Sequence, residues 1–252
     1  MLNLGGLLPI AGLAFFAELL DSSLGMGYGT ILSPVLLILG FNPLISIPSI
    51  LISQAMGGFI AGVFHHQFKN SDFRPGTRDS KIFLAFSGLG VLATVIGALL
   101  AVSVSKEFIE TYIGLLVLVI GILLILRVRF AFSRHKIFGL ALLSGFNKAI
   151  SGGGFGPLTT GGQVIVGHDH KNSVGITTLA EVPICSASFA VYFLTTGLPS
   201  WDLALALILG AATAAPFGAL LTKKLDTEKM RVALAVLITV LGIWTLLRTW
   251  IL

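Results

Sequence analysis

Two glycine-rich segments, 127 positions apart, place an acid and a base within an otherwise apolar chain. The first covers residues 21–29 and the second covers residues 148–156, and the offset carries Asp21 onto Lys148. An ammonium group is costly inside a membrane, so an intramembrane lysine marks a functional site by default. We predict that Lys148 attracts an anionic substrate, or that it forms an ion pair with an acidic side chain. The two roles are compatible, because a lysine can exchange a carboxylate for a substrate.

Glycines, hydroxyls and amides surround these two charges. Glycine permits non-helical backbone, which survives at membrane depth only where it is buried in protein or lines a cavity. A helix that restarts after such a break exposes free N–H groups and a positive dipole end, which suit an anion. The alternative is that the glycines only allow close helix packing. The predicted substrate-binding set is Ser22, Ser23, Gly25, Gly27, Tyr28, Gly29, Thr30, Asn147, Lys148, Ser151, Gly152, Gly153, Gly154, Phe155, Gly156 and Thr159.

A second group of polar residues could couple or gate transport. Glu181 lies near the middle of a long apolar segment, two residues before Pro183, and the offset of 127 matches it with Gln54. A buried carboxylic acid favours its neutral form unless it is paired. We therefore predict Glu181 as a proton carrier, with a helix-packing hydrogen bond as the alternative. Asp21 and Glu18 are second candidates, unless they are solvated near the outer surface, and the predicted coupling or gating set is Asp21, Gln54 and Glu181.

The composition predicts an integral membrane protein. Charged residues make up 11% of the chain and hydrophobic residues 55%, whereas a soluble domain carries about 25% charge. Backbone groups in hydrocarbon need internal partners, so membrane spans are helices or barrel strands. Residues 113–126 and 232–247 show no alternation of polar and apolar side chains, which excludes a barrel.

Long and short apolar segments alternate along the chain. A helix needs about 20 residues to cross the hydrocarbon core. The segments that we predict to be long enough cover residues 43–64, 82–102, 108–126, 172–196, 201–221 and 230–251. Shorter apolar segments flank the glycine breaks in two pairs, at residues 4–20, 28–39, 137–146 and 155–166.

We predict that the chain consists of two repeats of opposite orientation. Residues 1–130 form the first repeat and residues 131–252 the second, within one transmembrane domain. Each repeat contributes three long spans and a short hairpin, re-entrant or fully spanning, so the predicted fold class is an all-α polytopic membrane protein with 8–10 helical segments. Such inverted repeats place the binding site of many transporters at the membrane midplane.

Loop charges set the predicted topology. Lysine and arginine concentrate in cytoplasmic loops. Both termini, with Lys106 and Arg248, are then expected on the outer side of the cell (inner) membrane. The residues that we assign to the cytoplasmic side are Lys69, Arg74, Arg78, Lys81, Arg127, Arg129, Arg134, Lys136, Lys171, Lys223, Lys224, Lys229 and Arg231.

Other classes of protein are disfavoured. His168 and His170 flank an aspartate in a short turn without further ligands, so we predict no metal site, and no motif indicates a cofactor. The chain has no P-loop, nucleophile elbow or HExxH motif, and we predict that it is not an enzyme. The net charge of +5 comes from loops and does not indicate nucleic-acid binding. One cysteine, Cys185, allows no internal disulfide. No basic segment precedes Glu18, the first charged residue, so we expect no cleavable signal.

The duplicated break also carries a family resemblance. Gly-x-Gly-aromatic-Gly occurs at residues 25–29 and 152–156, with a proline in the short helix that follows, at Ser33-Pro34 and Gly156-Pro157. In these motifs the chain resembles the sulfite exporter TauE/SafE family of membrane permeases, over essentially its whole length. The resemblance implies transport of small sulfur-containing anions, such as sulfite or organosulfonates, usually outward. We expect the second break to contribute more of the site.

The predicted function is therefore secondary transport, with export the expected direction. A small sulfur-containing anion would bind between the two breaks, and the halves would rock about it. Alternatives are an anion-selective channel on the same fold or a carrier for a different small anion. The expected partners are the substrate, the lipid bilayer and protons as a coupling ion; the oligomeric state is left open.

Overall fold

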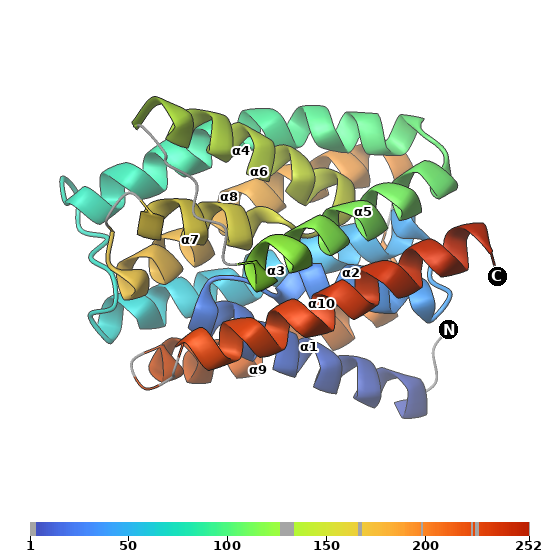
Figure 1. The fold of residues 1–252 in the computed structure, drawn as a ribbon, viewed down its shortest axis with the longest axis horizontal. Helices are drawn as coiled ribbons and strands as arrows, with labels where there is room; N and C mark the ends of the chain where they lie inside the picture. Colours follow the sequence, from blue (N-terminus) through green and yellow to red (C-terminus); the bar gives the residue numbers. More distant parts are fainter. Residues whose placement is uncertain are drawn as a thin grey trace.

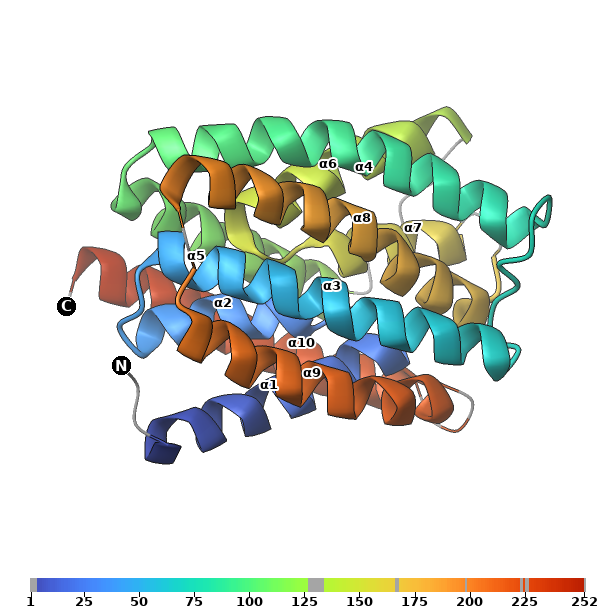
Figure 2. The same ribbon diagram turned by 180° about the vertical axis from the view of Figure 1, so that it is seen from behind.

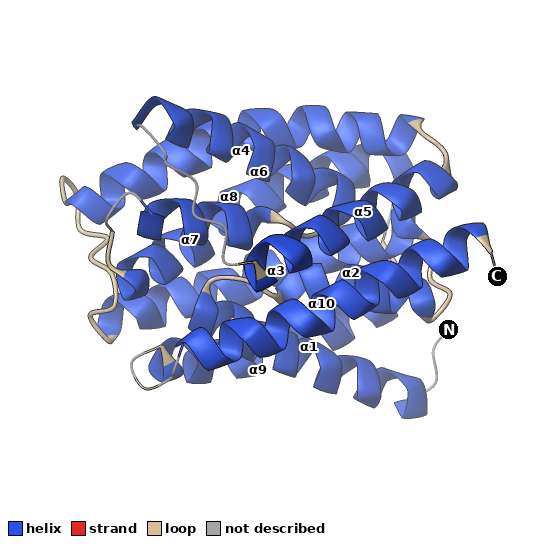
Figure 3. Ribbon diagram, in the orientation of Figure 1, coloured by secondary structure: helices blue, strands red, loops and turns tan. Residues whose placement is uncertain are grey.

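The computed structural model describes residues 4–126, 134–165, 168–197, 199–222, 224 and 227–251. Within these residues the chain forms ten α-helices and no strand (Figure 3), which confirms the predicted all-helical fold. In chain order the helices are α1 (Leu4–Leu24), α2 (Tyr28–Ile38), α3 (Pro43–Gln67), α4 (Arg78–Ser103), α5 (Lys106–Ile125), α6 (Arg134–Ser151), α7 (Phe155–Ile165), α8 (His170–Thr196), α9 (Trp201–Leu221) and α10 (Thr227–Trp250).

Both glycine breaks are shorter than predicted. Helix α1 continues through Asp21, Ser22 and Ser23, and α6 continues through Lys148 as far as Ser151. Within the two predicted breaks, only residues 25–27 and 152–154 are non-helical. The prediction that these side chains lie on irregular backbone is therefore wrong. A helix satisfies its own backbone hydrogen bonds, so it can carry polar side chains to membrane depth without unwinding.

The longer α1 also corrects the list of spans. The segment 4–20 was expected to be too short, but Gly6–Leu24 is long and apolar enough to cross a membrane. Five predicted spans are confirmed by α3, α4, α5, α8 and α9. The sixth, residues 230–251, lies in α10, where the described apolar part is Ala235–Trp250. Arg127, Arg129 and Lys223 lie outside the described residues, as does the predicted boundary between residues 130 and 131.

Helices α2 and α7 are half-length. Each has 11 residues, which corresponds to about 16 Å at about 1.5 Å per residue, roughly half of the hydrocarbon core. Each follows a longer helix and forms a hairpin with it. Both termini lie at one end of the bundle with the turn between α2 and α3, whereas the α3–α4 loop lies at the other end beside the start of α8 (Figure 1). The α1–α2 hairpin thus opens towards the termini, and the α6–α7 hairpin opens towards the opposite end.

The long helices of the two halves pack against each other (Figures 1 and 2). Helix α1 packs on α9, α6 on α4, α3 on both α8 and α9, α8 on α4, and α5 on α10. Exchanging α1 with α6, α3 with α8, α4 with α9 and α5 with α10 leaves this set of pairs unchanged. The packing of the long helices therefore has an approximate two-fold relation between the halves.

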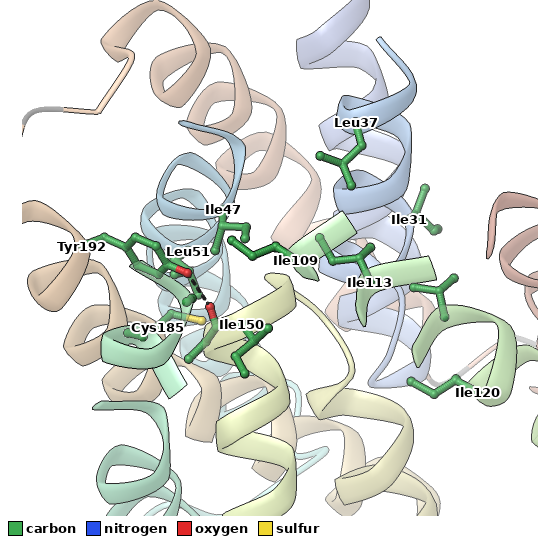
Figure 4. Packing of buried hydrophobic residues seen from close by; sticks show 14 of the residues in the cluster. Ile31, Leu37, Ile47, Leu51, Ile109, Ile113, Ile120, Ile150, Cys185 and Tyr192 are labelled. Carbon is green, nitrogen blue, oxygen red and sulfur yellow. Dashed lines mark hydrogen bonds between the residues drawn. The ribbon is translucent and has the colours of Figure 1, made fainter. Parts of the chain in front are cut away.

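Apolar side chains fill the space around the hairpins and also cover the outside. Ile31 on α2, Leu51 on α3, Ile113 on α5 and Ile150 on α6 belong to one buried cluster (Figure 4), which also has members on α1, α4, α8 and α10. Tyr192 lies within it and donates its hydroxyl to the Ala149 carbonyl at 2.9 Å, so the phenol is not left unpaired. Large apolar side chains on the outer surface, including Leu84, Leu92, Ile96 and Leu209, are well exposed. Large exposed apolar side chains of this kind suit contact with lipid.

The two breaks cross at backbone contact distance. A Cβ added to Gly153 would lie 2.8 Å from the Gly29 carbonyl carbon, and one added to Gly156 would lie 2.8 Å from the Met26 Cα. Real Cβ atoms do not approach other atoms so closely, so these positions need glycine. Gly25 and Gly152 also have φ values of +73° and +70°, in the left-handed region that other residues rarely adopt.

Reciprocal hydrogen bonds fasten this crossing. Ser33 on α2 donates its hydroxyl to the Ser151 carbonyl at the end of α6. Thr160 on α7 donates to the Gly25 carbonyl just after α1, at 2.9 Å. Ser33 and Thr160 are 127 positions apart, so each short helix holds the corresponding end of the other hairpin. Backbone carbonyls that the breaks release are paired in this way.

Gly156→Ala should destabilise the protein, because its methyl group would meet the backbone of Gly25 and Met26. We expect a loss of about 1–3 kcal/mol, the usual cost of overpacking. Gly161→Ala is the matched control on the same helix, since nothing lies within 4 Å of its added Cβ. Thermal unfolding in detergent measures both variants. Equal stability of the two would contradict the close crossing.

Candidate functional site

Lys148 lies at the centre of a buried polar cluster. Helix α6 carries it to the crossing of the hairpins, where 1% of its surface is exposed. Its ammonium lies 3.3 Å from Glu181 Oε1 and also donates to the side-chain carbonyl of Gln54. Among the lysines and arginines whose side-chain burial the structure describes, it is the only buried one. The alternative that Lys148 takes part in an ion pair is therefore realised in this structure.

Gln54 connects the cationic and anionic sides of the cluster. Its carbonyl oxygen accepts from Lys148, while its Nε2 donates to Asp21 Oδ2 at 3.1 Å and to Glu181 Oε2. The neighbours fix the amide orientation, because only the oxygen can accept from an ammonium and only the nitrogen can donate to carboxylates. Gln54 and Glu181, which are matched by the sequence offset, are thus in direct contact.

Asp21 occupies the start of helix α2. Its Oδ1 accepts from the backbone N–H of Tyr28, the first residue of that helix, at 3.0 Å. A carboxylate at a helix N-terminus is stabilised by the free N–H groups and by the helix dipole. The sequence predicted that this N-terminus would be open to a substrate, and the structure shows it bound by a carboxylate of the protein. The Tyr28 hydroxyl hydrogen-bonds Ser53 at 2.7 Å.

Glu18 adds a third carboxyl group one turn before Asp21. It is fully buried, and its Oε1 accepts from the Ser22 hydroxyl at 2.6 Å. The expectation that Glu18 and Asp21 could be solvated near the outer surface is wrong, because α1 buries both against α3, α8 and α9. Among the described residues this buried cluster therefore holds the acidic side chains of Glu18, Asp21 and Glu181 together with Lys148, on α1, α6 and α8.

The remaining predicted residues support the crossing more than they contact Lys148. Asn147 accepts from the Tyr112 hydroxyl on α5. Thr30 accepts from the Gly154 N–H at 3.5 Å, and Thr159 donates to the Phe155 carbonyl at 2.8 Å. Ser151 forms hydrogen bonds with the backbone of Gly153 in its own break. Ser23 donates to the Leu20 carbonyl. Phe155 packs in an apolar cluster with Phe86.

Sequence reasoning missed a second polar group beside the crossing. The hydroxyls of Thr177 on α8 and Thr160 are hydrogen-bonded at 2.9 Å, and Thr177 also accepts from Gln163 at 3.0 Å. The offset of 127 places Gln163 and Thr177 opposite Leu36 and Ile50, so the repeat gave no signal for either. Within the described ranges no group of three or more His, Cys, Asp or Glu side chains could hold a metal ion.

Each end of the bundle has an open cavity. The cavity beside the α3–α4 loop has a volume of about 580 Å³ and is lined by residues that include His66, Asn70 and Arg74. At its rim, hydrogen bonds from Arg74 lower the pKa of Asp72 to about 2, so this pair stays ionised at neutral pH. The opposite cavity, of about 290 Å³, is lined by residues between Asn42 and Pro48 and by the segment before α9. The buried cluster lies on helices that run between these two ends.

Apolar spans, two opposed hairpins and a buried ionic cluster together define a polytopic membrane transporter. The family model described as sulfite exporter TauE/SafE matches residues 10–245, and the chain belongs to that family. A curated relative, "Probable membrane transporter protein YtnM" of Bacillus subtilis (strain 168), is 26% identical over an alignment 261 positions long, which covers 97% of this chain and 84% of that protein. No solved structure matches the chain.

Removing one partner of the central ion pair should destabilise the fold strongly. Lys148→Met leaves Glu181 buried without its cation, a change that costs about 3–5 kcal/mol in buried pairs. The double variant Lys148→Met/Glu181→Gln should recover part of that loss, because it removes both charges. Unfolding free energies in detergent would measure this coupling.

A surface pair provides the control for this cycle. Lys106 and Glu110 lie 3.5 Å apart and are partly exposed, so Lys106→Met and Glu110→Gln should each change stability by less than about 1 kcal/mol. Additive effects of Lys148→Met and Glu181→Gln would show that the two side chains do not interact in the folded protein.

Proposed function

We propose that this protein is a secondary transporter of a small anion, most specifically a sulfur-containing one such as sulfite or an organosulfonate. The observation that carries the proposal is the buried ammonium of Lys148, which is bound by Glu181 and Gln54 where the two breaks cross. Side chains of the protein hold the place that an anion would take. The family description names sulfite, and the relative's name describes a membrane transporter.

The substrate would replace Glu181 as the partner of Lys148. An oxyanion could accept from the ammonium and from the Nε2 group of Gln54, which already donates to two carboxylates. The first N–H of α2 would become a further donor if Asp21 moved away from Tyr28. Because the crossing is closely packed, the groups around it suit a small anion.

The arrangement of the hairpins supports alternating access. They open towards opposite ends of the bundle (Figure 1), and the long helices pack with an approximate two-fold relation. These features agree with two inverted repeats, residues 1–130 and 131–252, that rock about a site at mid-depth. A carrier is favoured over a channel because Lys148, Asp21 and Glu181 are all at most 4% exposed, which leaves the cluster closed to both sides.

Transport can be tested with the protein reconstituted in vesicles. The panel comprises sulfite, thiosulfate, sulfoacetate and taurine, each measured by counterflow and with an imposed pH gradient. We expect saturable counterflow of at least one anion. Flux that does not saturate and cannot be driven uphill would instead favour the channel. Absence of flux for the whole panel, while another anion is carried, would reassign the substrate.

Lys148→Ala should lower the affinity for the transported anion about 10- to 100-fold, because a hydrogen bond to a charged group contributes about 1.5–3 kcal/mol. Lys106→Ala, at a partly exposed position at the bundle end, is the control and should bind as the wild type does. Unchanged affinity in a folded Lys148→Ala protein would refute this site.

The proposed orientation places the basic α3–α4 loop in the cytoplasm and both termini outside the inner membrane. Cysteine labelling on intact cells tests it, since the native Cys185 is buried and should not react. A membrane-impermeant maleimide should label Leu39→Cys in intact cells, and should label Arg74→Cys only after permeabilisation. Both positions are exposed, at opposite ends of the bundle. The reverse pattern would invert the topology.

A further inference from the structure

Glu18 is held in a compact space between three helices. It projects from α1 towards Gly57 of α3 and Ala211 of α9. A Cβ added to Gly57 would lie 3.1 Å from the Glu18 carboxyl carbon, 3.2 Å from its Oε2 and 2.9 Å from the Ala211 Cβ. The carboxyl group therefore packs directly on a glycine, and its side chain has no exposed surface.

The two carboxyl oxygens of Glu18 are unequal. Oε1 accepts from the Ser22 hydroxyl at 2.6 Å, whereas Oε2 has no hydrogen-bond partner among the described residues. The charged groups that face it are Asp21 on the same helix, Glu181 on α8 and Lys148 on α6. From α3 and α9 it meets small residues without charge.

None of these neighbours neutralises an ionised Glu18. Lys148 is already bound by Glu181 and Gln54, and Asp21 carries the same charge as Glu18. A buried carboxylate without a counter-ion is strongly disfavoured relative to its neutral acid. The environment therefore selects the protonated form of Glu18, with one proton on a carboxyl oxygen.

We propose that Glu18 carries the proton that is co-transported with the anion. This inference rests on the proposed function and names its coupling residue. A neutral Glu18 lowers the negative charge that opposes an anion at Lys148, so proton and anion favour each other's binding. When the cluster opens to water, Glu18 ionises, its proton passes to water, and the carboxylate disfavours the anion. The coupling is reciprocal, as linkage requires.

This assignment differs from the prediction that Glu181 carries the proton. Glu181 lies against the ammonium of Lys148 and the amide of Gln54, which stabilise its ionised form. Asp21 is stabilised likewise by Tyr28 N–H and Gln54. Glu18 alone of the three accepts a hydrogen bond only from a single hydroxyl, so in this closed arrangement Glu18 is the acid that the site holds in its neutral form.

The test compares Glu18→Gln with Glu110→Gln in reconstituted vesicles, with labelled sulfite and thiosulfate as probes. Glutamine keeps the shape of the neutral acid but cannot release a proton. Glu18→Gln should lose accumulation driven by a pH gradient while counterflow across equal pH persists. Glu110→Gln makes the same chemical change at the bundle end and should retain both activities.

A spectroscopic readout tests the protonation itself without any substrate. The infrared difference spectrum between wild type and Glu18→Gln at neutral pH should contain the C=O stretch of a neutral carboxylic acid, and that band should shift in deuterium oxide. If the wild type carries neither these probes nor the organosulfonates of the panel above, the proposed substrate class fails, and the infrared band still decides whether Glu18 is protonated.

Three results would overturn the inference. The first is pH-driven accumulation by Glu18→Gln equal to that of the wild type. The second is an infrared difference spectrum without the neutral-acid band. The third is loss of counterflow together with accumulation in a variant that elutes as a folded protein, because Glu18 would then belong to the substrate site.

Discussion

The structure depends on the neutralisation of one buried ammonium. Lys148 is buried inside the protein with 1% of its surface exposed, so its charge must be balanced by side chains from other helices. Glu181 supplies the opposite charge and Gln54 supplies a carbonyl oxygen. Gln54 also donates its amide hydrogens to Asp21 and Glu181. Side chains of α1, α3 and α8 are thereby linked to the ammonium on α6. Loss of any one of these contacts would leave a buried charged or polar group without a partner.

That ionic cluster can form only because the two hairpins approach so closely. Gly29 and Gly153 bring backbone against backbone, and the hydroxyls of Ser33 and Thr160 pair the carbonyls that the breaks release. Side chains at the glycine positions would separate the hairpins and move Lys148 away from its partners. Packing and electrostatics are therefore linked, since the glycines set the distance over which the charges interact.

The sequence predicted the architecture better than it predicted the site. Apolar length identified the long helices, and the offset of 127 identified Asp21, Lys148, Gln54 and Glu181, which do cluster. The prediction failed at α1. Asp21 and its neighbouring serines were expected in the break that follows a short helix, but α1 continues through them. The orientation of the Gln54 amide and the isolation of Glu18 could not be foreseen. Both depend on how α1, α3, α8 and α9 pack together, which no local pattern records.

The most informative contrast lies between matched positions. Ser33 and Thr160 have similar chemistry, and each donates its hydroxyl to a backbone carbonyl of the other hairpin. The two sides of the crossing are therefore held in nearly the same way. Asp21 and Lys148 occupy equivalent positions with opposite charge, and Gln54 faces Glu181 as a neutral counterpart. The framework is thus close to symmetric while the charges are not. The long helices of the two halves therefore pack alike, whereas the buried charges, which come from both halves, form one asymmetric cluster. Glu18 extends this asymmetry, because its counterpart at the same offset is Gly145, which has no side chain to titrate.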